Sequence, residues 1–162
     1  MGKKRIEIIN GPNLNMLGRR EVSLYGNRGF DIFYKDLAGI FPGFQFDYFQ
    51  SNIEGEIVTR LQQARDRSDA VIINPAAYTH TSVAIADALA LLDIPIIEVH
   101  ITNIYSREEF RHTSLTGRYA NGIIMGMGLE GYSLAVRAIE SLIGGYDLSG
   151  KQGGQVDAVS DD

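Results

Sequence analysis

The stretch DAVIINPAAYTHTSVAIADALALLDIPIIEVH, residues 69–100, decides the fold class. It opens with an apolar run over residues 70–73, continues through an apolar segment of helical length over residues 79–92, and ends in a second run over residues 95–99. Short, continuous Val and Ile runs are typical of parallel strands that are covered on both faces. The stretch therefore predicts a strand, a crossover helix and a second strand parallel to the first.

The same alternation extends over most of the chain. Five β-rich runs occur, at residues 5–10, 44–50, 70–73, 95–99 and 121–125. The second run alternates between apolar and polar residues, as an edge strand does. Strands that alternate with helices predict one α/β domain over residues 1–145. We expect a flavodoxin-like three-layer sandwich, with a five-stranded parallel sheet and helices on both of its faces.

Helical patterns separate these runs. They cover residues 30–40, 51–64, 79–92 and 132–143. Ser51 and Glu54 match a capping box and predict the start of the second helix, with Ile53 opening its apolar stripe. The third helix is apolar around most of its circumference, with Asp87 its one charged residue, so we expect it to be buried in the domain or against a partner. Gly144–Gly145 predicts the end of the last helix.

Composition narrows the classes of function. The chain has 162 residues and no cysteine, which excludes disulfides, thiolate metal ligands and cysteine nucleophiles. Its net charge of −5 gives no overall attraction to nucleic acid or to anionic lipid. The apolar run over residues 6–9 is too short for a signal peptide or a membrane span, so a cytoplasmic protein is expected. Residues 146–162, rich in Gly, Asp and Ser, predict a disordered polar tail.

Polar residues follow three of the predicted strands. They occupy residues 10–15, 74–80 and 98–100. In open α/β sheets the ligand binds outside the carboxyl ends of the strands, so these segments are candidates for one shared site. Taken singly, each has a simpler interpretation: Asn and Pro are common turn residues, His80 could assist a helix cap, and a Glu and a His two apart could be a polar pair on one strand face.

Two charged connections are further candidates. Residues 19–29 form a long loop that is either a solvated surface segment or a lid over a site. Residues 101–111 place Arg107 and Arg111 four apart, as on one helical face, where they could bind a carboxylate or a polyol. The alternative for these arginines is a set of surface ion pairs with the adjacent glutamates, Glu108 and Glu109.

Residues 126–131 match G-x-G-x-x-G, the pattern of a dinucleotide site. The motif follows the last strand, so no second strand completes the binding unit, and a tight turn with close helix packing is the preferred interpretation. A flavin- or nucleotide-binding module on the same fold remains the alternative, supported by the hydroxyl-rich residues 79–82. A third possibility is an assembly protein whose apolar helix serves only to form an oligomer.

The three histidines lack the spacing of a metal site, and no metal is expected.

Taken in order, these motifs resemble the type II 3-dehydroquinate dehydratases, also called type II dehydroquinases. The resemblance spans about residues 5–143. It rests on NGPNLN at residues 10–15, LGRRE at 17–21 and YG at 25–26, on NP at 74–75 with YTHTS at 78–82, and on EVH at 98–100 with REEFR at 107–111. It implies a flavodoxin-like subunit of a homododecamer, a tetramer of trimers, that uses no cofactor. The implied reaction is the anti elimination of water from 3-dehydroquinate through an enolate, giving 3-dehydroshikimate.

The resemblance also implies five catalytic roles. Tyr25 would be the base that removes a proton beside the ketone, and Arg20 would lower its pKa. Asn13 would stabilise the enolate through a water molecule. His100 would protonate the departing hydroxyl group, with Glu98 orienting its imidazole; an imidazole suits an acid role because it titrates near neutrality.

Six further residues would bind the substrate. Asn74, His80 and Arg111 would hold its hydroxyl groups, and the backbone amides of Ile101 and Thr102 would bind its carboxylate. Asp87 would reach the site of a neighbouring subunit.

Overall fold

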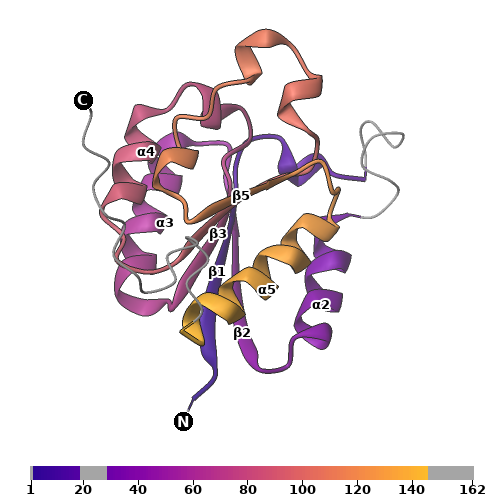
Figure 1. Ribbon diagram of the computed structural model, residues 1–162, viewed down its shortest axis with the longest axis vertical. Helices are drawn as coiled ribbons and strands as arrows, with labels where there is room; N and C mark the ends of the chain where they lie inside the picture. Colours follow the sequence, from indigo (N-terminus) through magenta and orange to yellow (C-terminus); the bar gives the residue numbers. More distant parts are fainter. Residues whose placement is uncertain (1, 19–28, 146–162) are drawn as a thin grey trace, which may run out of the picture.

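The computed structural model describes residues 2–18 and 29–145, and in them a five-stranded parallel sheet runs through the centre of the molecule (Figure 1). The strands are β1 (Lys4–Asn10), β2 (Phe44–Gln50), β3 (Ala70–Asn74), β4 (Ile96–His100) and β5 (Gly122–Met125). Their order is β2-β1-β3-β4-β5, and every neighbouring pair is parallel. This order confirms the predicted flavodoxin-like sheet and the edge position of β2.

Four α-helices cover the sheet. They are α2 (Phe30–Ile40), α3 (Glu54–Arg67), α4 (Val83–Ala90) and α5 (Glu130–Ile143). Helices α2 and α5 lie against one face, and α3 and α4 lie against the other (Figure 1). Successive side chains of a strand point to opposite faces, so Ile8 of β1 packs in the core under α2 and α5, and Ile9 packs in the core under α3 and α4. Both are fully buried, and each such side chain stabilises the fold by about 1.5–3 kcal/mol.

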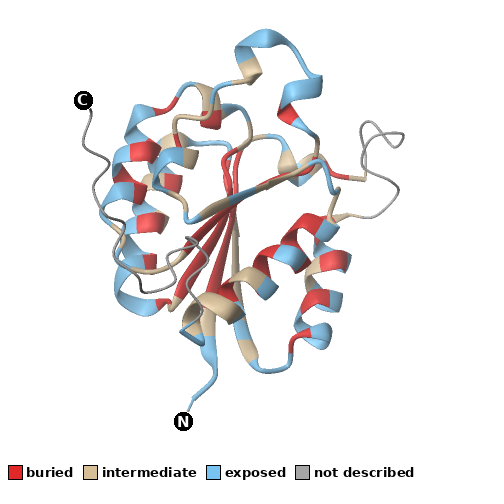
Figure 2. Ribbon diagram, in the orientation of Figure 1, coloured by how far each residue is buried: buried red, intermediate tan, exposed pale blue. Residues whose placement is uncertain are grey.

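Short 3-10 helices follow the carboxyl ends of the strands. They are η1 (Leu14–Met16), η2 (Ala76–His80), η3 (Ile104–Ser106), η4 (Glu109–Arg111) and η5 (Gly117–Tyr119). The inner strands are buried, whereas the projecting segment that contains η3 and η4 is mostly exposed (Figure 2). The sheet is therefore a rigid support for an irregular, polar rim at one end.

The helix predicted over residues 79–92 begins later than expected. Residues up to His80 form η2, and Ser82 caps α4 by accepting a hydrogen bond of 2.9 Å from the Ile85 amide. The correction has a physical reason, because the fully buried Thr79 hydroxyl hydrogen-bonds the Glu98 carboxylate instead of capping a helix. Burial of α4 is one-sided in this chain, since Val83 is 62% exposed.

The predicted capping box at the start of α3 is also wrong. The N-cap residue is Ile53, whose side chain is exposed, and Glu54 is already inside the helix. Ser51 instead accepts a hydrogen bond from the Ile53 amide and donates to Glu56, while Glu54 accepts from Ser82 at the start of α4. Glu54 therefore joins two helices, an interaction that local spacing does not reveal.

The glycines of residues 126–131 serve the turn between β5 and α5. Gly126 has φ 84°, and a Cβ added there would lie 3.2 Å from the Asn103 side chain. A Cβ at Gly131 would lie 3.1 Å from Val99, so this glycine allows α5 to approach β4 closely. These contacts favour the turn interpretation of the motif over a dinucleotide site.

Within the described residues, no helix has the combination of length and apolar character needed to cross a membrane.

Candidate active site

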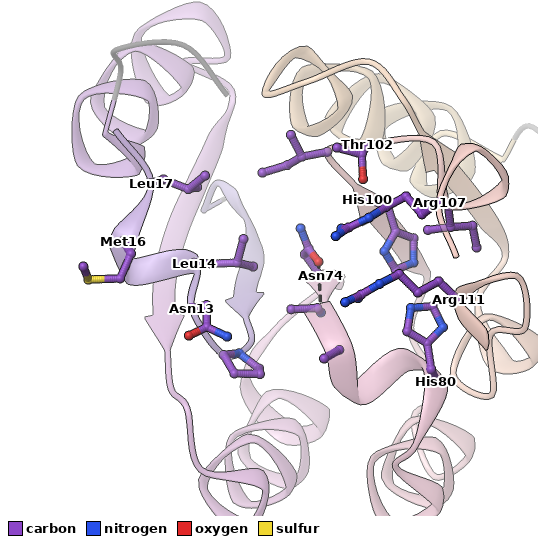
Figure 3. Close-up of a pocket in the computed structure, with 15 residues that line it drawn as sticks. Asn13, Leu14, Met16, Leu17, Asn74, His80, His100, Thr102, Arg107 and Arg111 are labelled. Carbon is purple, nitrogen blue, oxygen red and sulfur yellow. Dashed lines mark hydrogen bonds between the residues drawn. The ribbon is translucent and has the colours of Figure 1, made fainter. Parts of the chain in front are cut away.

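A cavity of about 330 Å³ opens at the carboxyl ends of β1, β3 and β4 (Figure 3). Its walls come from residues 12–17, 74–80 and 100–111, the three segments that follow these strands. The predicted site residues that line it are Asn13, Asn74, His80, His100, Ile101, Thr102 and Arg111. Three segments that are distant in sequence thus meet where the fold predicts a ligand.

The remaining predicted residues lie elsewhere. Glu98 is fully buried and lies behind His100 instead of lining the cavity. Asp87 is exposed on α4 and does not line the cavity of its own chain. Arg20 and Tyr25 lie outside the described residues.

Backbone contacts hold the segments that follow β1 and β3 together. The Gly11 amide donates a hydrogen bond of 2.8 Å to the Asn74 carbonyl, and a Cβ on Gly11 would lie only 2.4 Å from the Pro75 carbonyl oxygen. Among the residues that the structure describes, two non-glycine residues have positive φ, Asn13 at 68° and Ala76 at 53°. Both line the cavity, and such strained backbone is commonly retained at functional sites.

His100 and Glu98 form the central hydrogen-bonded pair. Nε2 of His100 lies 2.5 Å from Oε1 of Glu98, and both side chains are almost fully shielded from solvent. The carboxylate also accepts hydrogen bonds of 2.9 Å from Thr79 and Ser114 at Oε1 and from Thr116 at Oε2. Both oxygens of this buried carboxylate therefore have hydrogen-bond partners, three at Oε1 and one at Oε2.

These donors determine the charge of Glu98. Burial by itself raises the pKa of the Glu98 carboxyl, but the hydrogen bond and charge of His100, with hydrogen bonds from Thr116 and Ser114, outweigh burial and hold the pKa below its usual value. Glu98 is therefore ionised at neutral pH and places a negative charge beside the imidazole of His100. A buried anion that supports a cavity-lining imidazole is an arrangement suited to proton transfer.

Two arginines and a second imidazole line the cavity on the same side as His100 (Figure 3). Arg107 and Arg111 line the cavity, but the prediction that they share a helical face is wrong, because η3 ends at residue 106 and η4 covers residues 109–111. Glu108 lies 2.9 Å from Arg111 and 3.8 Å from Arg107, so the surface ion pairs also form. Nδ1 of His80 lies 2.8 Å from the Thr113 carbonyl, an obligate acceptor, so Nδ1 carries a proton.

Several supporting residues were not predicted from the sequence. Thr79, Ser114 and Thr116 surround Glu98, and the Tyr132 hydroxyl contacts Asn74 from beneath the cavity. No spacing signal links these residues, because the contacts with Glu98 and Asn74 span between 16 and 58 positions of the chain. Within the described part of the chain, no three His, Asp or Glu side chains are grouped so that they could hold a metal ion.

Comparisons with known proteins agree with this geometry. The model of the family described as Dehydroquinase class II matches residues 4–140. A 3-dehydroquinate dehydratase of Lachnoclostridium phytofermentans is 52% identical over 141 residues, covering 85% of this chain and 97% of the relative. One from Aliarcobacter butzleri is 48% identical and covers 86% of each chain.

Solved structures show the same relationship. A type II dehydroquinase from Butyrivibrio crossotus has a TM-score of 0.83 at 44% identity, over 86% of this chain and 99% of that chain. One from Propionibacterium acnes has a TM-score of 0.81 at 44% identity, over 86% and 97% of the two chains. The sequence match over almost the whole described domain and the shared fold lead to one conclusion: this chain belongs to the class II dehydroquinase family.

Proposed function

We propose that the cavity binds 3-dehydroquinate and that its residues carry out the dehydration to 3-dehydroshikimate. The chain is a 3-dehydroquinate dehydratase, a hydro-lyase of the shikimate pathway. The assignment of the active site rests on one observation. Nε2 of His100, at the wall of a cavity of about 330 Å³, lies 2.5 Å from Oε1 of Glu98. This volume suits one small cyclic acid.

The elimination proceeds in two steps. In the first, the Tyr25 phenolate removes the proton beside the ketone, Arg20 stabilises that phenolate, and an enolate forms. Asn13 holds the water molecule that donates a hydrogen bond to the enolate oxygen. In the second step the enolate collapses, the carbon–oxygen bond on the opposite face breaks, and the hydroxyl leaves as water with a proton from His100. The ring nitrogen that does not contact Glu98 delivers this proton.

The remaining cavity residues hold the substrate. The backbone amides of Ile101 and Thr102 bind the carboxylate, and their position directly after β4 supports this role. Asn74, His80 and Arg111 bind the hydroxyl groups. Charge-assisted and neutral hydrogen bonds from several segments hold the substrate ring between the base, Tyr25, and the acid, His100. Holding the reacting groups in this geometry lowers the barrier of the reaction.

A direct assay tests this function. Purified protein mixed with 3-dehydroquinate should produce the ultraviolet absorbance of a conjugated enone, and a chelator should make no difference. Absence of that absorbance under saturating substrate would overturn the proposal. A flavin- or nucleotide-binding module would instead be revealed by a bound chromophore or by a nucleotide-dependent rise in Tm.

Replacement of Glu98 by glutamine tests the proposed charge of the pair. We expect kcat at neutral pH to fall by about ten- to hundredfold, because a hydrogen bond between charged groups contributes about 1.5–3 kcal/mol. Wild-type Glu98 loses its own charge only as the pH falls through its lowered pKa, so the ratio of wild-type to variant kcat should be largest near neutral pH and shrink in that acid range. A loss of the same size at every pH would show that Glu98 acts only through packing.

The surface of α4 bears on assembly. Val83 and Asp87 of α4 and Leu91 at its C-cap are spaced four residues apart, so they lie on one side of the helix, and all three are exposed in the single chain. Val83 is 62% exposed and Leu91 is 58% exposed. We propose that this face contacts a neighbouring subunit of a homododecamer and that Asp87 reaches the neighbour's cavity. The apolar residues on either side of Asp87 support a subunit contact.

Mixed assemblies give a sharp test of the Asp87 role. Asp87→Ala alone should lower kcat/KM by about ten- to hundredfold, the effect of one lost hydrogen bond to a charged group. Co-assembly of Asp87→Ala subunits with inactive His100→Ala subunits should restore activity, because some sites then combine an intact His100 with a neighbour's Asp87. Mixtures that stay inactive after verified co-assembly would contradict a role across subunits. Native mass measurement reports the oligomer directly.

Three further assignments complete the proposal. Residues 1–145 form the single catalytic domain, and the enzyme is cytoplasmic. The tail predicted over residues 146–162 lies outside the described residues, and a chain ending at residue 145 should retain full activity and the same oligomer size.

A further inference from the structure

Two buried side chains beneath the cavity connect Asn74 to the core. The Tyr132 hydroxyl on α5 donates a hydrogen bond of 2.6 Å to Oδ1 of Asn10, at the end of β1. Nδ2 of Asn74, at the end of β3, donates one of 3.2 Å to the same hydroxyl. Tyr132 and Asn10 are fully buried, and Asn74 is 3% exposed. Asn74 lines the cavity (Figure 3), whereas Tyr132 and Asn10 are not among the lining residues.

The direction of these hydrogen bonds follows from one backbone group. The Ala76 amide can only donate, and it lies 3.0 Å from the Asn74 amide oxygen, so that oxygen is the acceptor. The Asn74 nitrogen must then face Tyr132, whose hydroxyl accepts from it. A phenol has one proton, so Tyr132 donates to Asn10 and the Asn10 oxygen must face it. The backbone thereby determines the orientation of both amides.

The position of the Tyr132 hydroxyl is itself fixed by packing. Its ring lies edge-on to Phe30, with centroids 4.9 Å apart, and contacts Phe33 at 6.0 Å. These aromatic contacts hold the ring in the core between α2, α5 and the sheet. Burial also raises the pKa of the phenol well above its usual value, which keeps the hydroxyl protonated.

We propose that Tyr132 is a positioning residue for substrate recognition, which holds the Asn74 amide so that its second N–H is presented to an acceptor oxygen of the ligand. The inference rests on the proposed function, since Asn74 must be a substrate contact. A side-chain amide that can flip presents either its N–H donor or its oxygen acceptor to a ligand. The Asn74 amide, held by Tyr132 and Ala76, presents only its donor, so it selects ligands that have a hydroxyl or carbonyl oxygen opposite Asn74.

The first experiment compares two Tyr→Phe variants. Tyr132→Phe keeps the ring packing and removes the hydroxyl, so KM for 3-dehydroquinate should rise about five- to tenfold while kcat changes by less than about twofold. Tyr34→Phe is a matched control, because its hydroxyl donates a 2.7 Å hydrogen bond to the Phe46 carbonyl within the same core and does not contact the cavity. The control should lower Tm but leave KM unchanged. A rise in KM of equal size in both variants would overturn the inference.

A double-mutant cycle with Asn74→Ala gives the decisive result. If Tyr132 acts through Asn74, then Tyr132→Phe should raise KM by less than about twofold when Asn74 is already alanine. Fully additive effects would show that Tyr132 only stabilises the fold. If Tyr132→Phe is insoluble, Asn10→Ala takes its place, because it removes the acceptor of the Tyr132 hydroxyl. This variant should also raise KM, and an unchanged KM would overturn the inference. A wild-type protein without turnover would instead overturn the proposed function, and the inference with it.

Discussion

Replacement of His100 by alanine is expected to lower kcat about a thousandfold and to change KM by no more than about threefold. The expectation follows from when the imidazole acts. Proton donation to the departing hydroxyl develops only in the transition state, so its loss raises the barrier without weakening the bound ground state. General acid catalysis of this kind contributes about 10²–10⁴ in rate.

His112→Ala is the control for this variant. His112 lies outside the cavity lining, and its Nε2 hydrogen-bonds the Arg107 carbonyl, so turnover should stay within about twofold of wild type. His80→Ala provides a contrast, because a residue that binds a substrate hydroxyl should raise KM more than it lowers kcat. A His100→Ala variant that loses affinity and keeps its kcat would contradict the acid role.

Tyr25→Phe is expected to reduce turnover by about a thousandfold or more, with the oligomer unchanged in size. A phenol ordinarily has a pKa near 10, so a base that works at pH 7 needs about 4 kcal/mol of preference for the phenolate. In the proposed mechanism the guanidinium of Arg20 supplies much of this preference. Phenylalanine keeps the ring and removes the oxygen that accepts the proton, so only proton abstraction is lost.

Two further variants separate this role from a structural one. Tyr105→Phe removes an exposed phenol beside the cavity wall and should leave turnover within about twofold of wild type. Arg20→Ala should move the low-pH limb of the kcat profile upward, because a base without its cationic neighbour loses its proton only at higher pH. Equal losses in the Tyr25 and Tyr105 variants would contradict the base role of Tyr25. A change in native mass would assign the loop of residues 19–29 a structural role.

The strands were predictable because their burial depends on local sequence. Nearly continuous Val and Ile runs over residues 70–73 and 95–99 are typical of parallel strands that are buried on both faces, and the structure places them at β3 and β4. Once the strand ends were known, the rule for open α/β sheets placed Asn74 and His100 at the same rim. Both line the cavity, and the prediction needed no knowledge of side-chain packing.

The supports behind the cavity could not be predicted in this way. Thr79 was expected at a helix start, because a hydroxyl before an apolar segment is a usual cap. In the structure its hydroxyl donates to the ionised Glu98 carboxylate, and a hydrogen bond to a charged group is stronger than one to a neutral backbone group at a helix end. Tyr132 was expected only as part of an apolar stripe on the last helix, and its hydroxyl reaches an acceptor 122 positions away on β1. Interactions of this range depend on how helices pack on the sheet, which periodicity does not specify.

The close approach of Gly11 to Pro75 has a consequence for altering the ligand preference of the enzyme. The separation of the cavity segments that follow β1 and β3 depends on a main-chain hydrogen bond and a missing Cβ, and not on the identity of the side chains nearby. Changes to Met16, Leu17 or Ile104, which line the same cavity, can therefore reshape its apolar surface while the distance between its walls is conserved. Libraries that vary these three positions and retain Gly11 are the rational starting point for accepting cyclic acids of other sizes.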